Sequence, residues 1–390
     1  MKKISNALTQ GTRLRGPRNT YCIQHALGQG TFGITYLATT EMEVIGQMGT
    51  FKTTVKVAVK EFFMKDFNGR ERAEVTVSSP SAYFVDYKRK FLREAENLSK
   101  LQCPHIVKVL ESFEANNTAY YAMEYLEGGS LDDYIKLHGA LNEGVTVKLA
   151  KQIGYALMYM HEHRMLHLDL KPSNVMLRFT GDAVLIDFGL SKQFDKKGVP
   201  ETSTSLGGGT PGYAPLEQTN YQRGDALPVT MDVYAFGATM YKMLTGECPP
   251  NAYDVYSDGF PSSVFEKHQI SDSLMNIVRR AMKPAHKDRY QNMREVIDAL
   301  CDIKRPSFSI GEMTVLDKEQ ECAKQKTNGM AVPMNEKESI PEKEKHSNGF
   351  LCILCLIGFI AGIVGFFLEW PHGLCIALVL GGGRGVAYYS

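Results

Sequence analysis

Residues 167–174 constrain this chain more than any other stretch. They read His-Leu-Asp-Leu-Lys-Pro-Ser-Asn, which places Asp169, Lys171 and Asn174 within six residues of one another, in a segment too rich in proline and asparagine for a helix. An Asp-Phe-Gly triplet begins thirteen residues after Asn174, at Asp187. An isolated Asp-x-Lys in a loop is usually only solvated. Oxygen-bearing side chains on either side of a short hairpin, Asn174 and Asp187, with Asp169 and Lys171 just before them, are harder to dismiss.

A glycine-rich stretch lies between two short β-prone runs near the start of the chain. Residues 21–27 and 34–38 are predicted strands, and residues 28–33 between them read Gly-Gln-Gly-Thr-Phe-Gly. A dinucleotide-binding turn would lead into a helix, but here a second strand follows. The pattern therefore predicts a strand–turn–strand hairpin. Its glycines would let backbone N–H groups approach phosphate closely and would tolerate unusual dihedral angles.

Residues 55–63 alternate apolar and polar side chains as a half-buried strand does, and their Val-Ala-Val-Lys ends at Lys60. A strand lysine usually faces solvent, but the glycine-rich hairpin upstream favours a binding role for Lys60. Residues 39–54 are read as an extended connection, and residues 68–83 as a polar surface insertion. Residues 87–101 have apolar residues at helical spacing and carry Glu94 and Glu96, both candidates to pair with Lys60. Residues 104–109 and 119–123 are the next predicted strands, which close a sheet of about five strands.

The motifs and their order along the chain resemble those of the protein kinase family. The resemblance covers residues 21 to about 303. It implies an α+β, two-lobed fold, with a small β-rich N-lobe over about residues 21–123 and a larger helical C-lobe over about residues 127–303. Residues 1–20 are predicted to be a flexible lead-in, in which residues 11–14 could add a short edge strand. Lys171 resembles the lysine of kinases specific for Ser/Thr, and the motif style is similar to bacterial members of the eukaryotic-like (Hanks-type) group. The implied activity is phosphorylation of Ser/Thr hydroxyls on proteins, including autophosphorylation.

The resemblance also implies the cofactors, ATP and Mg²⁺ with Mn²⁺ as an alternative, and a role for each polar residue. Asp169 would accept the proton of the substrate hydroxyl, Lys171 would neutralise the γ-phosphate, and Asn174 and Asp187 would hold the metal ions. Lys60 would contact the α- and β-phosphates and be braced by a glutamate of the following helix. The residues that would surround ATP are Leu27, Gly28, Gly30, Gly33, Thr35, Ala58, Lys60, Glu94 in preference to Glu96, the gatekeeper Met123, and Glu124 and Leu126 of the hinge.

The segment from 187 to 217 resembles an activation segment and ends in Pro-Leu-Glu where the family usually has Ala-Pro-Glu. Its Glu217 would pair with a buried Arg289, and Thr210 would lie against Asp169 and Lys171. Residues 167–174 resemble the catalytic loop of the family, and an aspartate at position 232 would hold the backbone of this loop. Leu168 stands where most members carry an arginine that binds a phosphate on the activation segment. We therefore expect activity to depend little on phosphorylation of the Ser/Thr cluster at 202–205.

Composition excludes some other classes. Forty-four basic against 43 acidic residues give a formal charge of +1, which argues against a nucleic-acid partner. The eight cysteines lack zinc-ligand spacing, and the N-terminal residues lack the apolar core of a secretory signal.

Residues 304–349 are polar and charged, and we expect a disordered linker there. Residues 350–368 contain no charge, and at about 1.5 Å per residue they would span about 28 Å, close to the ~30 Å hydrocarbon core of a membrane. They are predicted to form a transmembrane helix, with the basic residues upstream placing the kinase domain in the cytoplasm. Residues 369–390 would be a short tail or the return arm of a hairpin. The predicted localisation is therefore a single-pass membrane protein, with a hairpin as the alternative, and self-association is a further expectation.

Two other functions remain open from the sequence. A kinase fold with weak or no catalysis could bind ATP and organise partners at the membrane as a scaffold. A small-molecule kinase of the same fold is the third class, and it is disfavoured by the Gly-Thr-Pro-Gly-Tyr run at 209–213, which resembles a peptide-binding loop.

Overall fold

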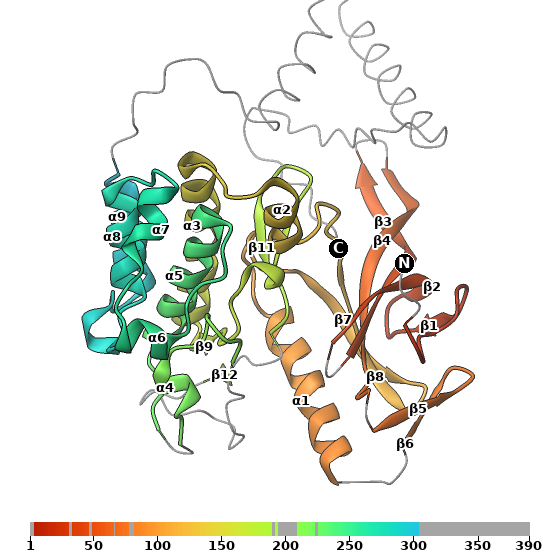
Figure 1. Cartoon of the computed structure of the whole chain (residues 1–390). Coiled ribbons are helices and arrows are strands. Elements are labelled where there is room, and N and C mark those ends of the chain that lie inside the picture. Colours follow the sequence, from red (N-terminus) through yellow and green to blue (C-terminus); the bar gives the residue numbers. More distant parts are fainter. Residues whose placement is uncertain are drawn as a thin grey trace, which may run out of the picture. The chain divides into compact units, whose positions relative to one another are not determined.

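The computed structural model describes residues 4–30, 33–46, 49–65, 67–77, 82–188, 192–193, 209–222 and 225–303. They all belong to one compact unit, Met1–Gly311. Figure 1 shows a β-rich N-lobe and a helical C-lobe. The predicted linker at 304–349, the predicted span at 350–368 and the predicted tail at 369–390 lie outside the described residues. Within the described ranges, none of the helices is long and apolar enough to span a membrane.

The N-lobe is built on an antiparallel sheet of six described strands in the order β1-β2-β3-β4-β8-β7. The sequence predicted about five. The strands of this sheet are β1 (Arg13–Arg15), β2 (Thr20–Gln29), β3 (Gly33–Gly46), β4 (Gly49–Phe62), β7 (Val109–Ala115) and β8 (Thr118–Glu124).

The prediction of a strand at residues 104–109 is wrong, because β7 begins only at Val109. Pro104 has no N–H to donate to a ladder. The residues after it bond to the C-lobe instead: Val107 N donates to Leu185 O at 3.0 Å, and Leu185 N donates to His105 O at 2.9 Å. This segment therefore joins the two lobes rather than extending the sheet.

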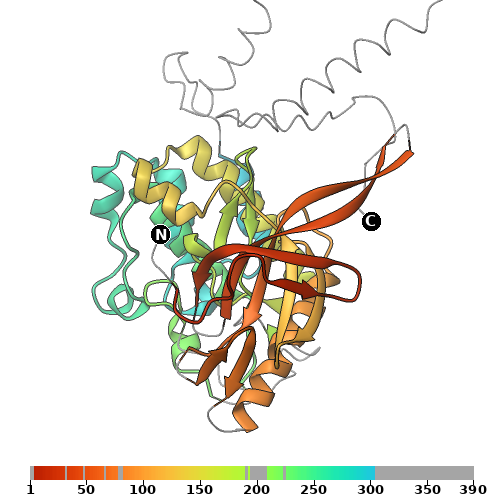
Figure 2. The ribbon, with the colours of Figure 1, turned by 90° about the vertical axis from the view of Figure 1, so that its right-hand side faces the viewer.

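Strands β3 and β4 are longer than predicted. They pair without interruption from Gly33–Phe62 to Gly46–Gly49, so the stretch read as an extended connection is part of one hairpin. Strand β2 pairs with β3 only as far as Thr39, and β8 pairs with β4 only from Val57. Beyond these points the hairpin continues as a two-stranded ribbon (Figure 2). The predicted surface insertion at 68–83 contains a second hairpin, β5 (Asn68–Glu71) with β6 (Glu74–Val77), and the start of helix α1 (Ala82–Ser99).

The short edge strand predicted at residues 11–14 is confirmed by β1, which lies at the edge of the sheet. The rest of the N-terminal segment is not the flexible lead-in that was predicted but packs on the sheet. Leu8 and Leu14 are buried, and Leu8 N donates to the Tyr36 hydroxyl at 3.2 Å. Glu111 on β7 accepts hydrogen bonds from Arg18 N at 2.9 Å and from Asn19 N at 3.1 Å. Only residues 1–3 of this segment lie outside the described part.

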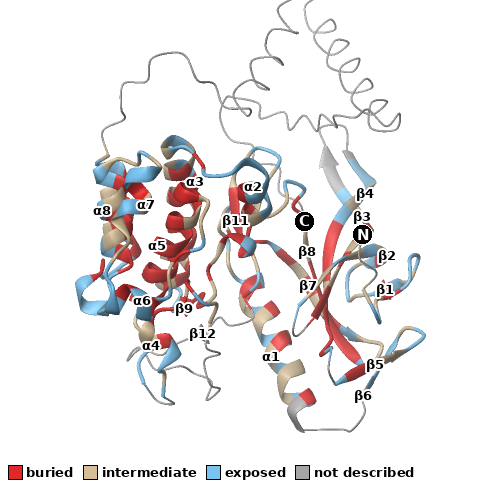
Figure 3. Ribbon diagram, in the orientation of Figure 1, coloured by how far each residue is buried: buried red, intermediate tan, exposed pale blue. Residues whose placement is uncertain are grey.

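The C-lobe surrounds helix α5 (Thr230–Thr245), nearly all of whose residues are buried (Figure 3). Ser130 accepts a hydrogen bond from Asp133 N at the start of α2, and Asn142 caps α3 in the same way. The other helices are α2 (Leu131–His138), α3 (Glu143–Glu162), α4 (Leu216–Thr219), α6 (Ala252–Ser257), α7 (Ser262–Lys267), α8 (Asp272–Ala281), α9 (Met293–Cys301) and the 3-10 turns Pro172–Asn174 and His286–Asp288. Short strands β9 (Met165–Leu166) and β10 (Val175–Leu177) pair with β12 (Lys192–Gln193) and β11 (Ala183–Leu185).

Candidate active site

The glycine-rich turn is the strand–turn–strand hairpin that its sequence predicted. Strands β2 and β3 flank it, and Gly30 N donates to Gly33 O at 2.9 Å. A Cβ atom on Gly33 would lie 2.6 Å from Glu61 O, so the neighbouring strand requires glycine there. A Cβ on Gly28 or Gly30 would have no described atom within 4 Å. None of these three glycines has a positive φ, and of the three only Gly33 has a close neighbour among the described residues.

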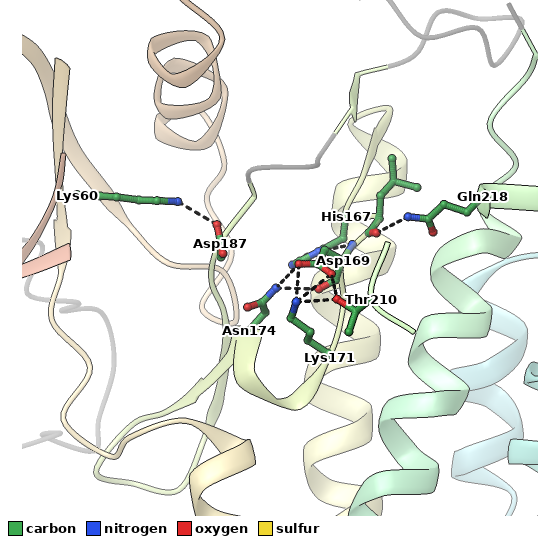
Figure 4. A network of polar contacts seen from close by, with 9 residues as sticks. Lys60, His167, Asp169, Lys171, Asn174, Asp187, Thr210 and Gln218 are labelled. Atoms are coloured by element: carbon green, nitrogen blue, oxygen red, sulfur yellow. Dashed lines mark hydrogen bonds and ion pairs between the residues drawn. The ribbon is translucent and has the colours of Figure 1, made fainter. Parts of the chain in front are cut away.

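One face of the sheet faces the catalytic loop, and the space between them is called the cleft from here on (Figure 4). Across the strands, Thr35 pairs with Lys60, and Lys60 pairs with Tyr121. Because side chains two residues apart share a face of a strand, Ala58 and Met123 lie on the same side as Lys60. Ala58 and Met123 also pair with each other, and Ala58 is buried, whereas Leu27 on β2 is largely exposed.

Lys60, Glu94 and Asp187 meet at the inner end of this face. The Lys60 ammonium lies 2.9 Å from Asp187 Oδ1 and 3.8 Å from Glu94 Oε1. Glu96, the other candidate, is exposed and pairs with Lys100. Burial alone would lower the pKa of Lys60, but the charges of Asp187 and Glu94 outweigh it and hold that pKa well above its ordinary value. Burial raises the pKa of Glu94, against the pull of Lys60.

The hinge links β8 to the C-lobe. Glu124 N donates to Lys108 O at 3.0 Å, and Glu124 pairs with Val57 of β4. The Glu124 side chain is bound elsewhere, because Arg178 donates to both its carboxylate oxygens at 2.6 and 3.0 Å. Leu126 is buried, and two residues later Gly128 N donates to Leu177 O. The hinge is therefore fixed to the β10–β11 hairpin that follows Asn174.

The catalytic loop brings Asp169, Lys171, Asn174 and Thr210 into one cluster (Figure 4). Lys171 Nζ lies 3.1 and 2.9 Å from the two carboxylate oxygens of Asp169 and donates to Thr210 Oγ1 at 2.8 Å. Thr210 Oγ1 donates to Asp169 Oδ1 at 2.7 Å. The Asn174 amide donates to the carbonyl and to Oδ2 of Asp169 at 2.8 and 3.0 Å. The predicted contact of Thr210 with Asp169 and Lys171 is thus observed.

The backbone of this loop is clamped from two sides. The buried Asp232 carboxylate accepts hydrogen bonds from His167 N and Leu168 N, both at 2.9 Å, as predicted. Burial raises the pKa of Asp232, but these amides and the His161 side chain lower it below its ordinary value. On the other side, the buried Gln218 side chain donates to Leu168 O at 2.7 Å (Figure 4).

Leu168, which stands where most family members have an arginine, has an unusual backbone conformation and a buried side chain. Its φ of +63° is left-handed, which is unusual for a leucine. Its side chain is buried in a small apolar cluster with Leu166, Leu227 and Met231. The position therefore holds the loop by packing, and its side chain does not face solvent.

The end of the activation segment is also anchored as predicted. Arg289 is buried and donates to both carboxylate oxygens of Glu217 at 2.5 and 3.0 Å. Its remaining donors go to the carbonyls of Lys283, Pro284 and Thr230. A buried charge satisfied in this way is costly to disturb.

Comparison with known families agrees with this geometry. A model described as "Protein kinase domain" matches residues 21–307. The chain belongs to the protein kinase family. Together with the two-lobed fold, this confirms the family that the motifs resembled.

Three curated relatives show how far the similarity of this kinase extends. It is 27% identical over 305 residues to serine/threonine-protein kinase PrkC of Bacillus subtilis, which covers 72% of this chain and 46% of that one. It is 32% identical over 221 residues to serine/threonine-protein kinase PknB of Mycobacterium leprae, which covers 53% and 34%. A probable serine/threonine-protein kinase of Clostridium perfringens is 29% identical over 246 residues, 60% and 34% of the two chains. The chain thus spans between about a third and a half of the length of these relatives.

The residues present fit the divalent metal ion that protein kinases use. Because the Asn174 nitrogen donates to Asp169, its side-chain oxygen points away from Asp169 (Figure 4). Asp187, at the end of the same hairpin, has a left-handed φ of +58° and a half-exposed carboxylate. Amide and carboxylate oxygens suit Mg²⁺, and Mn²⁺ accepts the same ligands. The described residues contain no group of three or more His, Cys, Asp or Glu that could hold a metal ion.

Three residues of the kinase site were not singled out from the sequence. Leu37 pairs with Ala58 and Tyr121 pairs with Lys60, so both lie on the cleft face. Strand alternation from the neighbouring site residues would have found them. Gln218, the clamp on Leu168, follows directly after Glu217 and has no sequence signal that separates it from a surface glutamine.

Proposed function

We propose that this chain transfers the γ-phosphoryl group of ATP to Ser/Thr hydroxyls of proteins, its own included. The observation that carries this proposal is the cluster of Asp169, Lys171 and Thr210. Here a carboxylate that could orient a hydroxyl is held by an ammonium group that could face the transferred phosphate. The names of the relatives, which are serine/threonine-protein kinases, support the same choice of acceptor.

Phosphoryl transfer asks a protein mainly for positioning and for compensation of charge. Asp169 would accept a hydrogen bond from the incoming hydroxyl and take its proton, and the hydrogen bonds from Lys171 and Thr210 keep this carboxylate in one place. Lys171 would share its ammonium between Asp169 and the γ-phosphate. Lys60 would hold the α- and β-phosphates, and the glycine-rich hairpin would cover them.

Asn174 and Asp187 would hold the metal ion, which neutralises charge on the phosphates when it is bound. The hinge carbonyl of Glu124 and the buried Leu126 would receive the adenine edge, between Leu27 and Ala58 on one side and Met123 at the back. Thr35 keeps the β-branched shape of the family's usual valine at this position, so we expect little change in nucleotide packing.

The test is phosphate transfer from labelled ATP to the chain itself and to a generic basic protein in the presence of Mg²⁺. Asp169→Asn keeps the size of the side chain but removes the base, and we expect the rate to fall by roughly 10²–10⁴-fold. Asp272→Asn, on the exposed start of α8, is the matched control and should leave the rate unchanged. Phosphosite mapping of the same reaction reports whether the acceptors are Ser/Thr.

The scaffold alternative predicts a different result. A full-length chain that binds ATP but transfers no phosphate above the Asp187→Asn background would show that the fold serves as a scaffold. No described contact favours this reading, because Lys60, Asp169, Asn174 and Asp187 are all present and grouped in the cleft.

The proposal includes a membrane tether. Its support is the uncharged run at 350–368 and the basic residues upstream of it, which would leave the kinase domain on the cytoplasmic side. The full-length chain should stay in the membrane pellet after alkaline carbonate extraction, whereas a chain ending at Lys304 should be released. If the full-length chain is released as well, residues 350–368 are not a membrane span. Protease protection of the C-terminal end would separate a single span from a hairpin.

A further inference from the structure

Tyr121 has a position in the cleft that no described motif accounts for. It lies on β8 directly opposite Lys60 on β4, so the two side chains share one face of the sheet. The side chain is buried. It comes two residues before Met123, between the gatekeeper and the inner end of the cleft.

The tyrosine contacts both members of the Lys60–Glu94 ion pair. Its hydroxyl donates to Glu94 Oε1 at 3.3 Å, the same oxygen that lies 3.8 Å from Lys60 Nζ. The Lys60 ammonium lies 5.7 Å from the centroid of the tyrosine ring. That ring packs against Phe91 of helix α1 with centroids 5.0 Å apart, one turn of helix before Glu94.

The ion pair needs such support. At 3.8 Å the contact between Lys60 and Glu94 is longer than a hydrogen bond, whereas Lys60 lies 2.9 Å from Asp187. The Glu94 carboxylate, which is partly buried, accepts a hydrogen bond from the tyrosine hydroxyl. Among the described residues, loss of that hydroxyl would leave the Lys60 ammonium, 3.8 Å away, as the polar group that orients Glu94.

We propose that Tyr121 is a positioning residue of the nucleotide site: its hydroxyl fixes the Glu94 carboxylate from β8, and its ring holds α1 through Phe91, so that Lys60 faces the cleft. The inference rests on the proposed function in that Lys60 is taken to hold ATP. It adds a third group to the lysine–glutamate pair, and that group comes from the strand of the gatekeeper rather than from α1 or β4.

The chain offers a matched control in the neighbouring residue. Tyr120 points to the opposite face of β8, is equally buried, and donates its hydroxyl to a buried glutamate, Glu61 Oε1, at 2.6 Å. Glu61 also accepts hydrogen bonds from Arg70 and Tyr36, and among the described residues it makes no hydrogen bond or ion pair with Lys60. Each Tyr→Phe change therefore removes one hydroxyl from a glutamate carboxylate, and only Tyr121→Phe does so on the face of the sheet that carries Lys60.

The experiment compares Tyr121→Phe with Tyr120→Phe in the full-length chain. For Tyr121→Phe we expect a loss of about tenfold in kcat/KM for ATP, the lower end for a hydrogen bond to a charged group, with an unchanged KM for the protein substrate. Tyr120→Phe should lower the thermal midpoint but leave the parameters for ATP as in the wild type. Equal effects of the two variants on ATP, or an effect of Tyr121→Phe on the thermal midpoint alone, would overturn the proposal.

A double-mutant cycle identifies the route of the effect. If Tyr121 acts through Glu94, then Tyr121→Phe should cause no further loss of kcat/KM in a Glu94→Ala background, whereas independent effects would multiply. The Kd for ATP, measured by direct binding, is the readout that does not need catalysis. A wild type that binds ATP without transferring phosphate would remove the proposed function, and a weaker Kd of Tyr121→Phe relative to Tyr120→Phe would still support the positioning role.

Discussion

Asp169 accepts hydrogen bonds from three neighbours at 2.7–3.1 Å, while across the cleft Lys60 has one contact of 2.9 Å and one of 3.8 Å. The first group, the acceptor side, consists of Asp169, Lys171, Asn174 and Thr210. The second, the nucleotide side, consists of Lys60, Glu94 and Asp187. Three of the four acceptor-side residues come from one short loop, whereas the nucleotide side is assembled from β4, α1 and the residues after β11.

This difference indicates how the loss of a single contact would affect each side. On the acceptor side several donors hold one carboxylate, so the loss of one leaves the others in place. On the nucleotide side, one ammonium, that of Lys60, contacts the carboxylates of both Glu94 and Asp187, so its loss affects both contacts at once. A shift of α1 relative to β4 would separate Glu94 from Lys60 but would leave the acceptor side intact. We therefore expect control of this kinase to act mainly on the nucleotide side.

The largest effect is expected from Lys60→Met. It removes the only ammonium described between Glu94 and Asp187, and activity should fall by roughly 10²–10³-fold, the range for loss of one electrostatic group in a closed site. The measurement is kcat/KM for ATP. Lys56→Met is the matched control, because Lys56 lies on the same strand in an exposed ion pair with Glu127 that should contribute at most about 1 kcal/mol. A loss for Lys60→Met no larger than for the control would contradict the role given to this side.

A smaller effect is expected from Thr210→Val, which keeps the shape of the side chain but removes the hydroxyl between Asp169 and Lys171. Because Lys171 and Asn174 still hold Asp169, kcat should fall by about tenfold, the lower end for a hydrogen bond to a charged group. Thr210→Ser keeps the hydroxyl and should stay close to wild type. If Thr210→Val costs as much activity as Lys60→Met, the contacts of the acceptor side are not redundant and the contrast between the two sides is wrong.

The smallest effect is expected when the four residues of the Ser/Thr cluster at 202–205 are replaced by alanine. This cluster lies outside the described residues. Leu168 is buried among Leu166, Leu227 and Met231 and cannot pair with a phosphate, so the loop is held whether or not the cluster is phosphorylated. Peptide phosphorylation should stay within a few-fold of wild type, about the effect of a change of 1 kcal/mol or less in the barrier. A near-complete loss of activity would show that a phosphate in this cluster is anchored by another group.

Much of the cleft was predictable because the residues that form it carry local patterns. The catalytic loop lies within eight residues, and the glycine-rich hairpin is marked by strands on both sides. Glu94 and Glu96 could not be separated by helical periodicity alone, and only the structure shows Glu96 exposed beside Lys100. Tyr121 was within reach of the same reasoning, since alternation along a strand puts it on the face of Met123.

Other features depend on contacts between distant residues and could not be predicted. The N-terminal segment was expected to be flexible apart from a short edge strand, yet Glu111, 93 positions after Arg18, holds its backbone. The absence of an arginine at position 168 is visible in the sequence, and the loss of a phosphate anchor there stays a prediction. What replaces it, a cluster with Leu227 and Met231 some sixty residues later, is a matter of tertiary packing.

The pairing of Glu217 with Arg289 has a consequence for how the chain folds during its synthesis on the ribosome. The two residues are 72 positions apart, and a growing chain adds about 5–20 residues per second, so the carboxylate is made roughly 4–14 s before its guanidinium partner. During this interval the end of the activation segment lacks its anchor. Stalled nascent chains that end before residue 289 should therefore be cut by protease near Glu217, and chains long enough to expose Arg289 outside the ribosome should be protected.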